Sequence, residues 1–238
     1  PLSDSAYEVL LKYAVSLSGT EQKMTLHLPW IHDLIRGADF IARQNKKAKI
    51  DSAFVLQALN QKEERENYPQ KEWLSAVKNQ WIHLTVKGTK VGALNTLSVC
   101  LNKKRFGRVA CLSALTYAGN GVITDVEQQS HFGGSVHTKG LLILSAYLSS
   151  RFGQVEPMKL NASLTFEQSY TPIDGDSASA AELCALMSSI AGISLTQEIA
   201  LTGSVNQRGE IQAVGGLNEK ITGFFDVCQT LGMTKKHE

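Results

Sequence analysis

The sequence has few cysteines and lacks the spacings that would pair them. Its four cysteines, Cys100, Cys111, Cys184 and Cys228, are far apart and include no CxxC pair. Neither a disulfide framework nor a zinc cluster has this spacing, so we interpret them as reduced thiols of a cytoplasmic protein. The six histidines also fail to cluster with cysteines or carboxylates, and we expect no metal site.

Long apolar runs and a strong excess of charge are also missing. No segment approaches the roughly 20 consecutive apolar residues that a membrane helix requires, and the start lacks a signal-peptide pattern. The net charge is +2, which indicates neither nucleic acid nor a membrane surface as a partner. Because the sequence does not begin with Met, we expect it to be a piece of a longer protein. Hydrophobic residues make up 43%, typical of a globular protein with a sizeable core.

The first third of the sequence has the periodicity of helices. Apolar residues recur at helical spacing within 6–17, 30–42 and 54–59. Gly19 is a stop signal for the first helix, and Asp51 and Ser52 are plausible caps for the third. The polar stretch 61–71 marks a domain boundary, and we divide the chain into a helical subdomain, 1–75, and a second domain, 76–238.

From about residue 84 the apolar pattern changes to a period of two, which is typical of strands. Strands are predicted at 82–86, 94–101, 108–117, 122–127, 162–167, 198–204 and 210–214. Helices are predicted at 139–151, 177–192 and 218–231. Strands and helices alternate, and we expect an α+β fold in which a mixed sheet follows the helical subdomain.

One segment, TPIDGDSASA at 171–180, suggests chemistry. A turn at 172–175 leads directly into a helix of small residues, so Ser177 is expected near a helix N-terminus. Backbone N–H groups there point outward and can stabilise a tetrahedral oxyanion. A serine in this position is, taken alone, more often a helix cap than a nucleophile.

A second segment changes that interpretation. It reads LTGSVNQRGEIQAVGGLNEK at 201–220. Together the two segments resemble the signatures of the Lon protease family, the D-G-x-S-A block of the nucleophile and the T-G-x5-G-x4-V/I-G-G-x-x-E-K block of its paired lysine. Lys220 follows Ser177 by 43 positions, the separation typical of that family. The variants EQSY and DGDSAS resemble the LonB and Lon-related branch, and the resemblance covers roughly 80–232.

The resemblance implies a serine peptidase with a Ser–Lys dyad that degrades unfolded or damaged proteins. Ser177 would be the nucleophile, Lys220 its general base, and Thr202 the residue that orients the lysine. Lysine is a base only when neutral, so burial or the positive end of a helix must lower its pKa. Asp176 is a possible modulator that pairs with Lys220 and keeps it charged, or it simply complements the helix N-terminus.

The resemblance also extends to the helical subdomain, which is similar to the lid of an AAA+ ATPase module. Arg36 and Arg43 are candidates for a nucleotide-sensing arginine. No GxxxxGK[ST] phosphate loop is present, so the chain itself would bind no cofactor, and ATP and Mg²⁺ would belong to an AAA+ core outside it. The implied partners are polypeptide substrates and further copies in a hexameric ring. Because domains of this family usually continue further past the lysine, we expect 76–238 to be incomplete at its C-terminus.

Other interpretations fit the sequence less well. The alternative is a catalytically silent Lon-like assembly or interaction domain of an ATPase, but this chain keeps both dyad residues. Ser75 and Lys78 form an SxxK tetrad without the SDN and KTG motifs that accompany it in penicillin-binding proteins, and there is no GxSxG elbow. His137 and Lys139 are interpreted as structural or interface residues.

Overall fold

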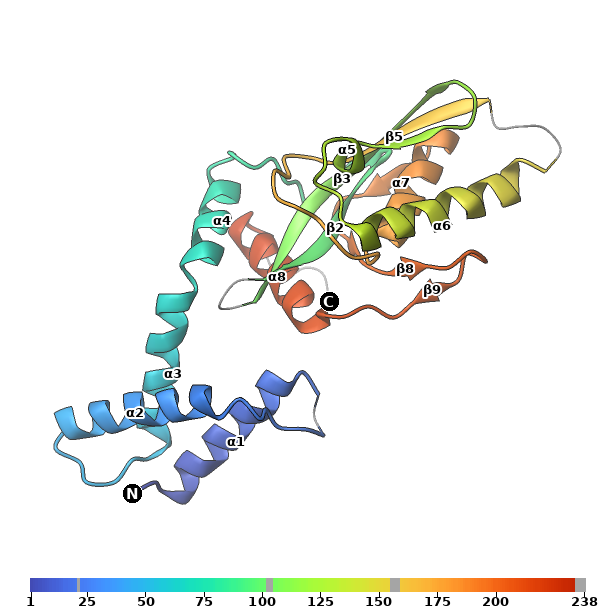
Figure 1. Cartoon of the computed structure of the whole chain (residues 1–238). Coiled ribbons are helices and arrows are strands. Elements are labelled where there is room, and N and C mark those ends of the chain that lie inside the picture. Colours follow the sequence, from blue (N-terminus) through green and yellow to red (C-terminus); the bar gives the residue numbers. More distant parts are fainter. Residues whose placement is uncertain (21, 102–104, 155–158, 234–238) are drawn as a thin grey trace. The chain divides into compact units, whose positions relative to one another are not determined.

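The computed structural model describes residues 1–20, 22–101, 105–154 and 159–233, which belong to two compact units (Figure 1). The first unit is Pro1–Pro69 and the second is Gln70–Glu238. The boundary therefore lies in the first turn of helix α4 (Tyr68–Lys78), close to the division at 75/76 that polarity favoured.

The first unit consists of three helices with the capping signals seen in the sequence. They are α1 (Asp4–Ser18), α2 (Leu28–Gln44) and α3 (Ser52–Glu66). Gly19 ends α1 with a left-handed φ of 72°, and the Asp51 carboxylate accepts the N–H groups of Ala53 and Phe54 at the start of α3. The buried core of this unit is formed by Ala6, Leu10, Leu34, Ala38, Ile41, Ala42, Ile50, Val55 and Ala58.

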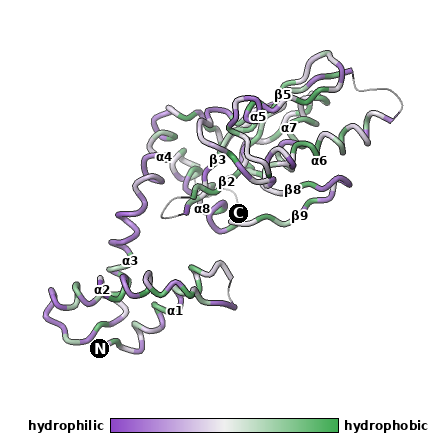
Figure 2. The backbone as a smooth tube through the Cα atoms, viewed as in Figure 1, coloured by the Kyte–Doolittle hydropathy of each residue, from purple (hydrophilic) through white to green (hydrophobic). Residues whose placement is uncertain are grey.

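The polar stretch 61–71 is helical along most of its length. It forms the end of α3 and the beginning of α4, and Figure 2 shows the second half of α3 as strongly hydrophilic. Its polarity thus reflects solvent exposure of a helix. Trp73 and Val77, the two buried residues of α4, pack within the second unit.

A five-stranded mixed sheet forms the framework of the second unit, in the order β4-β5-β3-β2-β7. The central pairs β2–β3 and β3–β5 are antiparallel, whereas β4–β5 and β2–β7 are parallel. The strands are β2 (Ala93–Cys100), β3 (Phe106–Ala118), β4 (Ile123–Asp125), β5 (Leu160–Phe166) and β7 (Ala200–Leu201). Two further antiparallel pairs are β1 (Thr89–Val91) with β6 (Ser194–Thr196) and β8 (Ser204–Val205) with β9 (Ile211–Gln212).

Side chains along β3 point alternately to the two faces of the sheet, and helices pack on both faces. Leu112 and Ala114 belong to the core shared with helices α6 (Ser135–Phe152) and α7 (Ser179–Ala191). Val109 and Cys111 belong to the core that contains Val227 of helix α8 (Leu217–Thr230). A short helix, α5 (Val126–Gln129), joins β4 to α6. The expected α+β class with a helical unit before a mixed sheet is confirmed.

Four of the predicted strands were wrong in part or in full, and one of them, 210–214, is reduced to β9 (Ile211–Gln212). Residues 82–86 form no strand and lie in irregular chain, although Leu84 and Val86 are buried. The predicted strand 122–127 ends at Asp125, whose side chain caps α5. The predicted strand 198–204 is broken, because the Gly203 N–H leaves the sheet to bond the carbonyl of Ser177.

No helix in the described part of the chain combines the length and the apolar character needed to cross a membrane.

Candidate active site

Ser177 lies in the tight turn that precedes α7. The predicted helix starts two residues later than expected, at Ser179, so that Ser177 is outside it. The Ser177 carbonyl accepts hydrogen bonds from the Gly203 N–H at 2.8 Å and from the Thr202 hydroxyl at 3.1 Å. The broken strand after β7 thus fixes the backbone that carries the serine.

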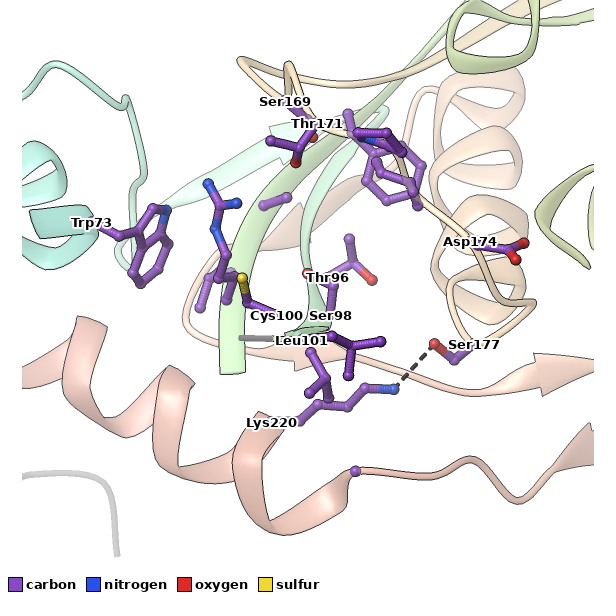
Figure 3. Close-up of a pocket in the computed structure, with 18 of the residues that line it drawn as sticks. Trp73, Thr96, Ser98, Cys100, Leu101, Ser169, Thr171, Asp174, Ser177 and Lys220 are labelled. Carbon is purple, nitrogen blue, oxygen red and sulfur yellow. Dashed lines mark hydrogen bonds between the residues drawn. The ribbon is translucent and has the colours of Figure 1, made fainter. Parts of the chain in front are cut away.

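Lys220 approaches Ser177 from the first turn of α8. Its Nζ lies 3.1 Å from Ser177 Oγ and 2.9 Å from Thr202 Oγ1, as Figure 3 shows for the serine. The structure therefore brings together all three residues that the sequence named for the reaction centre. They come from three segments, the turn before α7, the chain after β7 and the start of α8.

Two glycines set the position of α8, and sequence reasoning missed them. A Cβ added at Gly107 of β3 would lie 2.0 Å from the carbonyl oxygen of Glu219 and 3.0 Å from the Cα of Lys220. A Cβ at Gly223 would lie 2.4 Å from the carbonyl oxygen of Gly107. Helix and strand thus touch backbone to backbone beside the lysine, a contact that only glycine permits.

The environment of Lys220 disfavours its charge. The residue is only 3% exposed, and this burial lowers the pKa of its amine below the ordinary value. Its place in the first turn of α8 adds the positive end of the helix dipole, which acts in the same direction. The negative charge of Asp176 opposes burial and raises the pKa of Lys220.

Asp176 forms no direct ion pair with Lys220 among the residues that the structure describes. Its carboxylate instead accepts a hydrogen bond of 2.8 Å from the Ser204 hydroxyl at the start of β8. It therefore acts on the lysine through charge over a distance, without the direct pairing that was one of the two interpretations of Asp176 from the sequence.

An open pocket of about 520 Å³ leads to the serine and the lysine. Figure 3 shows Ser98 and Cys100 of β2 along one side of it and Trp73 of α4 at its far end. The Arg108 guanidinium lies 5.7 Å from the centre of the Trp73 ring. Strand β7 pairs with β2 only opposite Asn95 and Thr96, and within the described chain no further strand pairs with the outer edge of β2 at residues 97–99.

Asp174 anchors the turn of the nucleophile, and this role was not identified from the sequence. Figure 3 shows its carboxylate turned away from Lys220, and it accepts the N–H groups of Val136 at 3.0 Å and His137 at 3.2 Å. The hydrogen bond from the Gly175 N–H and those from His137 and Val136 lower the pKa of Asp174. An Asp in a turn is a common cap, but its partners are 38 and 37 positions away, and only folding shows them.

The other residues singled out in the sequence lie elsewhere. Ser75 and Lys78 belong to α4, and the Ser75 hydroxyl accepts a local hydrogen bond from Asn79. In the first unit, Arg43 pairs with Asp39 of the same helix at 2.9 Å. His137 is buried, as a structural role requires, whereas Lys139 is exposed. None of the four cysteines is in a disulfide, and the described residues contain no cluster suited to a metal ion.

Comparison with known families agrees with this arrangement. Residues 1–65 match the family model of the archaeal LonB AAA+ ATPase lid domain. Residues 154–225, which include Ser177, Thr202 and Lys220, match that of the Lon protease (S16) C-terminal proteolytic domain.

Curated relatives are similar along nearly the whole chain. A protein of Escherichia coli (strain K12) described as a Lon protease homolog is 37% identical over 234 residues, 97% of this chain and 39% of that protein. A protein of Haemophilus influenzae with the same description is 34% identical, covering 87% of this chain and 34% of that protein. An archaeal Lon protease of Thermoplasma acidophilum is 27% identical, covering 91% and 33%. The chain thus spans between a third and two fifths of the length of these relatives. With a LonB-type lid segment followed by a Lon-type proteolytic segment, the chain belongs to the Lon protease family.

Proposed function

We propose that the second unit hydrolyses peptide bonds with Ser177 as nucleophile and Lys220 as general base. The observation that carries this proposal is the 3.1 Å separation of Lys220 Nζ and Ser177 Oγ, which come from segments 43 positions apart. A serine hydroxyl becomes an effective nucleophile when a base within hydrogen-bond reach takes its proton.

The surroundings of the lysine support the neutral amine that this role needs. Burial lowers its pKa, and no ion pair of Lys220 with a carboxylate occurs in the described chain. The Thr202 hydroxyl donates its proton to the Ser177 carbonyl, so its lone pairs accept an N–H of Lys220. That contact orients the amine, and its lone pair is then free to accept the proton of Ser177 Oγ.

The reaction follows from these contacts. Lys220 takes the proton of Ser177 while Oγ forms a bond to the substrate carbonyl carbon. The N–H groups of Ser177 and Ala178, which donate to no acceptor within the described residues, support an oxyanion site. When the C–N bond breaks, Lys220 returns the proton to the leaving amine. Water then cleaves the acyl-enzyme with Lys220 again as the base.

The shape of the site suits an extended polypeptide. The outer edge of β2 at residues 97–99, beside the pocket, offers backbone groups to which a substrate strand can pair. For the longer protein we propose ATP-dependent degradation of unfolded polypeptides by a hexameric ring, with ATP and Mg²⁺ bound by an AAA+ core. The lid-type match of residues 1–65 supports this arrangement. The four cysteines, none of which is in a disulfide, are consistent with the reducing, cytoplasmic setting that we propose.

Mass spectrometry after reaction with a serine-directed phosphonate tests the proposal. We expect labelling at Ser177 that disappears in Ser177→Ala and falls at least 100-fold in Lys220→Met, which removes the base without burying a new charge. Ser150→Ala, on the exposed side of α6, is the matched control and should label like wild type. The experiment is run on this chain and, where the gene encodes a longer product, on that assembled product. A folded protein that fails to label in both forms would make this a silent Lon-like interaction domain.

A further inference from the structure

A second group of ionisable side chains is buried behind the nucleophile turn. Asp125, Glu127, His137 and Glu182 are each no more than 3% exposed, and none of them forms a hydrogen bond or ion pair with Ser177 or Lys220 in the described structure. Burying four such groups together is costly unless they neutralise one another. The contacts that offset this cost are therefore of interest.

The imidazole of His137 lies at its centre. Its Nε2 is 2.9 Å from Asp125 Oδ2, and its Nδ1 is 3.7 Å from Glu182 Oε1. The first contact is a hydrogen bond, whereas the second is too long for one. The ring also packs edge-on against Phe166 of β5, with 5.8 Å between ring centres. His137 is thus tightly bound on one side and only loosely on the side of α7.

Glu127 closes the cluster from α5. Its Oε1 accepts hydrogen bonds from the Phe166 N–H at 3.0 Å and the Thr165 hydroxyl at 3.2 Å. Its Oε2 is buried and has no hydrogen-bond partner among the described atoms. Burial raises the pKa of this carboxyl, and the neighbouring Asp125 raises it further. Both effects disfavour a charge on Glu127, whereas the hydrogen bond from the Phe166 N–H favours it.

The cluster is joined to both sides of Ser177. On the N-terminal side, the backbone N–H of His137 binds Asp174, and the Gly134 N–H binds the carbonyl of Ile173 at 2.8 Å. On the C-terminal side, Glu182 lies in the first turn of α7, and its N–H binds the carbonyl of Ala178 at 2.9 Å. A change in the contact of His137 with Glu182 would therefore move the two supports of the nucleophile relative to each other.

Charge in the cluster changes near neutral pH. Burial raises the pKa of Glu182 to about 7, although the attraction of His137 lowers it. Burial opposes a charge on His137, but the hydrogen bond to Asp125 and the charges of Glu182 and Asp125 raise its pKa overall. The groups that act on Glu182 are His137 of α6, Asp125 at the end of β4 and Glu127 of α5; the strands packed on α7 contribute none among the described residues. The carboxylates around His137 thus favour its charged form, which attracts an ionised Glu182.

We propose that His137 is a positioning residue for Ser177, and that Glu182, when ionised, draws His137 toward α7 and so holds the nucleophile turn in its reactive position. The proposal rests on the function assigned to Ser177 above. With Glu182 protonated, the Nδ1 contact stays at the long distance seen here and the turn is held less firmly. With Glu182 ionised, the imidazolium has a carboxylate at each ring nitrogen.

The test is the pH dependence of phosphonate labelling at Ser177 in wild type and in Glu182→Gln, from pH 6 to 8. A group with a pKa of about 7 goes from about a tenth ionised to about nine tenths ionised over this range. The wild-type rate should therefore rise about tenfold more than the Glu182→Gln rate, which keeps only the dependence due to Lys220. Glu210→Gln, on the exposed turn before β9, is the control and should follow wild type.

Each result has a distinct meaning. Identical pH profiles of wild type and Glu182→Gln would overturn the positioning role while leaving the proposed function intact. A wild-type protein that does not label would overturn the proposed function, and the positioning role with it. If Glu182→Gln does not fold, the proposal is tested instead by hydrogen exchange of the backbone amides of residues 173–178 in the wild type. We expect at least threefold stronger protection at pH 8 than at pH 6, after correction for intrinsic exchange, and equal protection would overturn the proposal.

Discussion

The close contact of β3 with α8 offers a stringent test of how Lys220 is positioned, through the substitution Gly107→Ala. The added methyl would lie 2.0 Å from the carbonyl oxygen of Glu219, whereas real Cβ contacts are essentially never shorter than 3.0 Å. The obstacle is backbone and cannot rotate away. Helix α8 must therefore retreat by about 1 Å or more, and it carries Lys220 with it.

The expected consequence is loss of the base contact without loss of the fold. A retreat of about 1 Å lengthens the distance between Lys220 Nζ and Ser177 Oγ from 3.1 Å to about 4 Å, which is beyond a hydrogen bond. Misplacement of a reacting group by about 1 Å costs on the order of 100-fold in rate. We therefore expect the rate of phosphonate labelling at Ser177 to fall about 100-fold in Gly107→Ala.

The assay compares labelling rates at pH 8 with circular dichroism and thermal unfolding of the same samples. Leu115→Ala provides the control on the same strand, because Leu115 is 69% exposed and remote from α8, and it should label within about twofold of wild type. A folded Gly107→Ala protein that labels at the wild-type rate would refute the reasoning, because Lys220 would then not depend on the glycine contact.

Three further predictions concern the site itself. Lys220→Arg should lower the labelling rate at least 100-fold, since a guanidinium stays protonated and cannot act as a base, and labelling at the wild-type rate would contradict the dyad. Thr202→Val should lower the rate about 10- to 100-fold by removing the 2.9 Å contact that orients the amine, whereas Thr202→Ser should stay within a few-fold of wild type. Asp176→Asn should lower the pKa of Lys220, because the aspartate charge raises it; the neutral fraction of the lysine increases with pH, so the rising limb of the rate profile should move to lower pH. An unchanged profile would show that Asp176 does not act on the lysine.

Helix limits near caps could be predicted from local sequence, because the signals are local. Asp51 and Gly19 act on atoms within three residues of themselves, so their neighbours suffice to place the ends of α3 and α1. The predicted limits of strands were less accurate where they depend on hydrogen bonding to a segment far away in the sequence. Residues 82–86 have the composition of a strand but pair with no strand of the described chain, and the strand after Ala200 is broken by a hydrogen bond from the Gly203 N–H to the Ser177 carbonyl.

Sequence alone determined which residues to consider at the site, because two motifs with fixed internal spacing named Ser177, Thr202 and Lys220. Tertiary structure decided how they work. The 3.1 Å contact, the burial that lowers the pKa of Lys220, and the approach of α8 at Gly107 all join segments far apart in the chain. The buried cluster around His137 has no sequence signal, since its members lie on separate elements and ordinary polar residues have no mark of burial. A motif records residue types and spacing, whereas distance, dielectric environment and mutual charge exist only after packing brings the segments together.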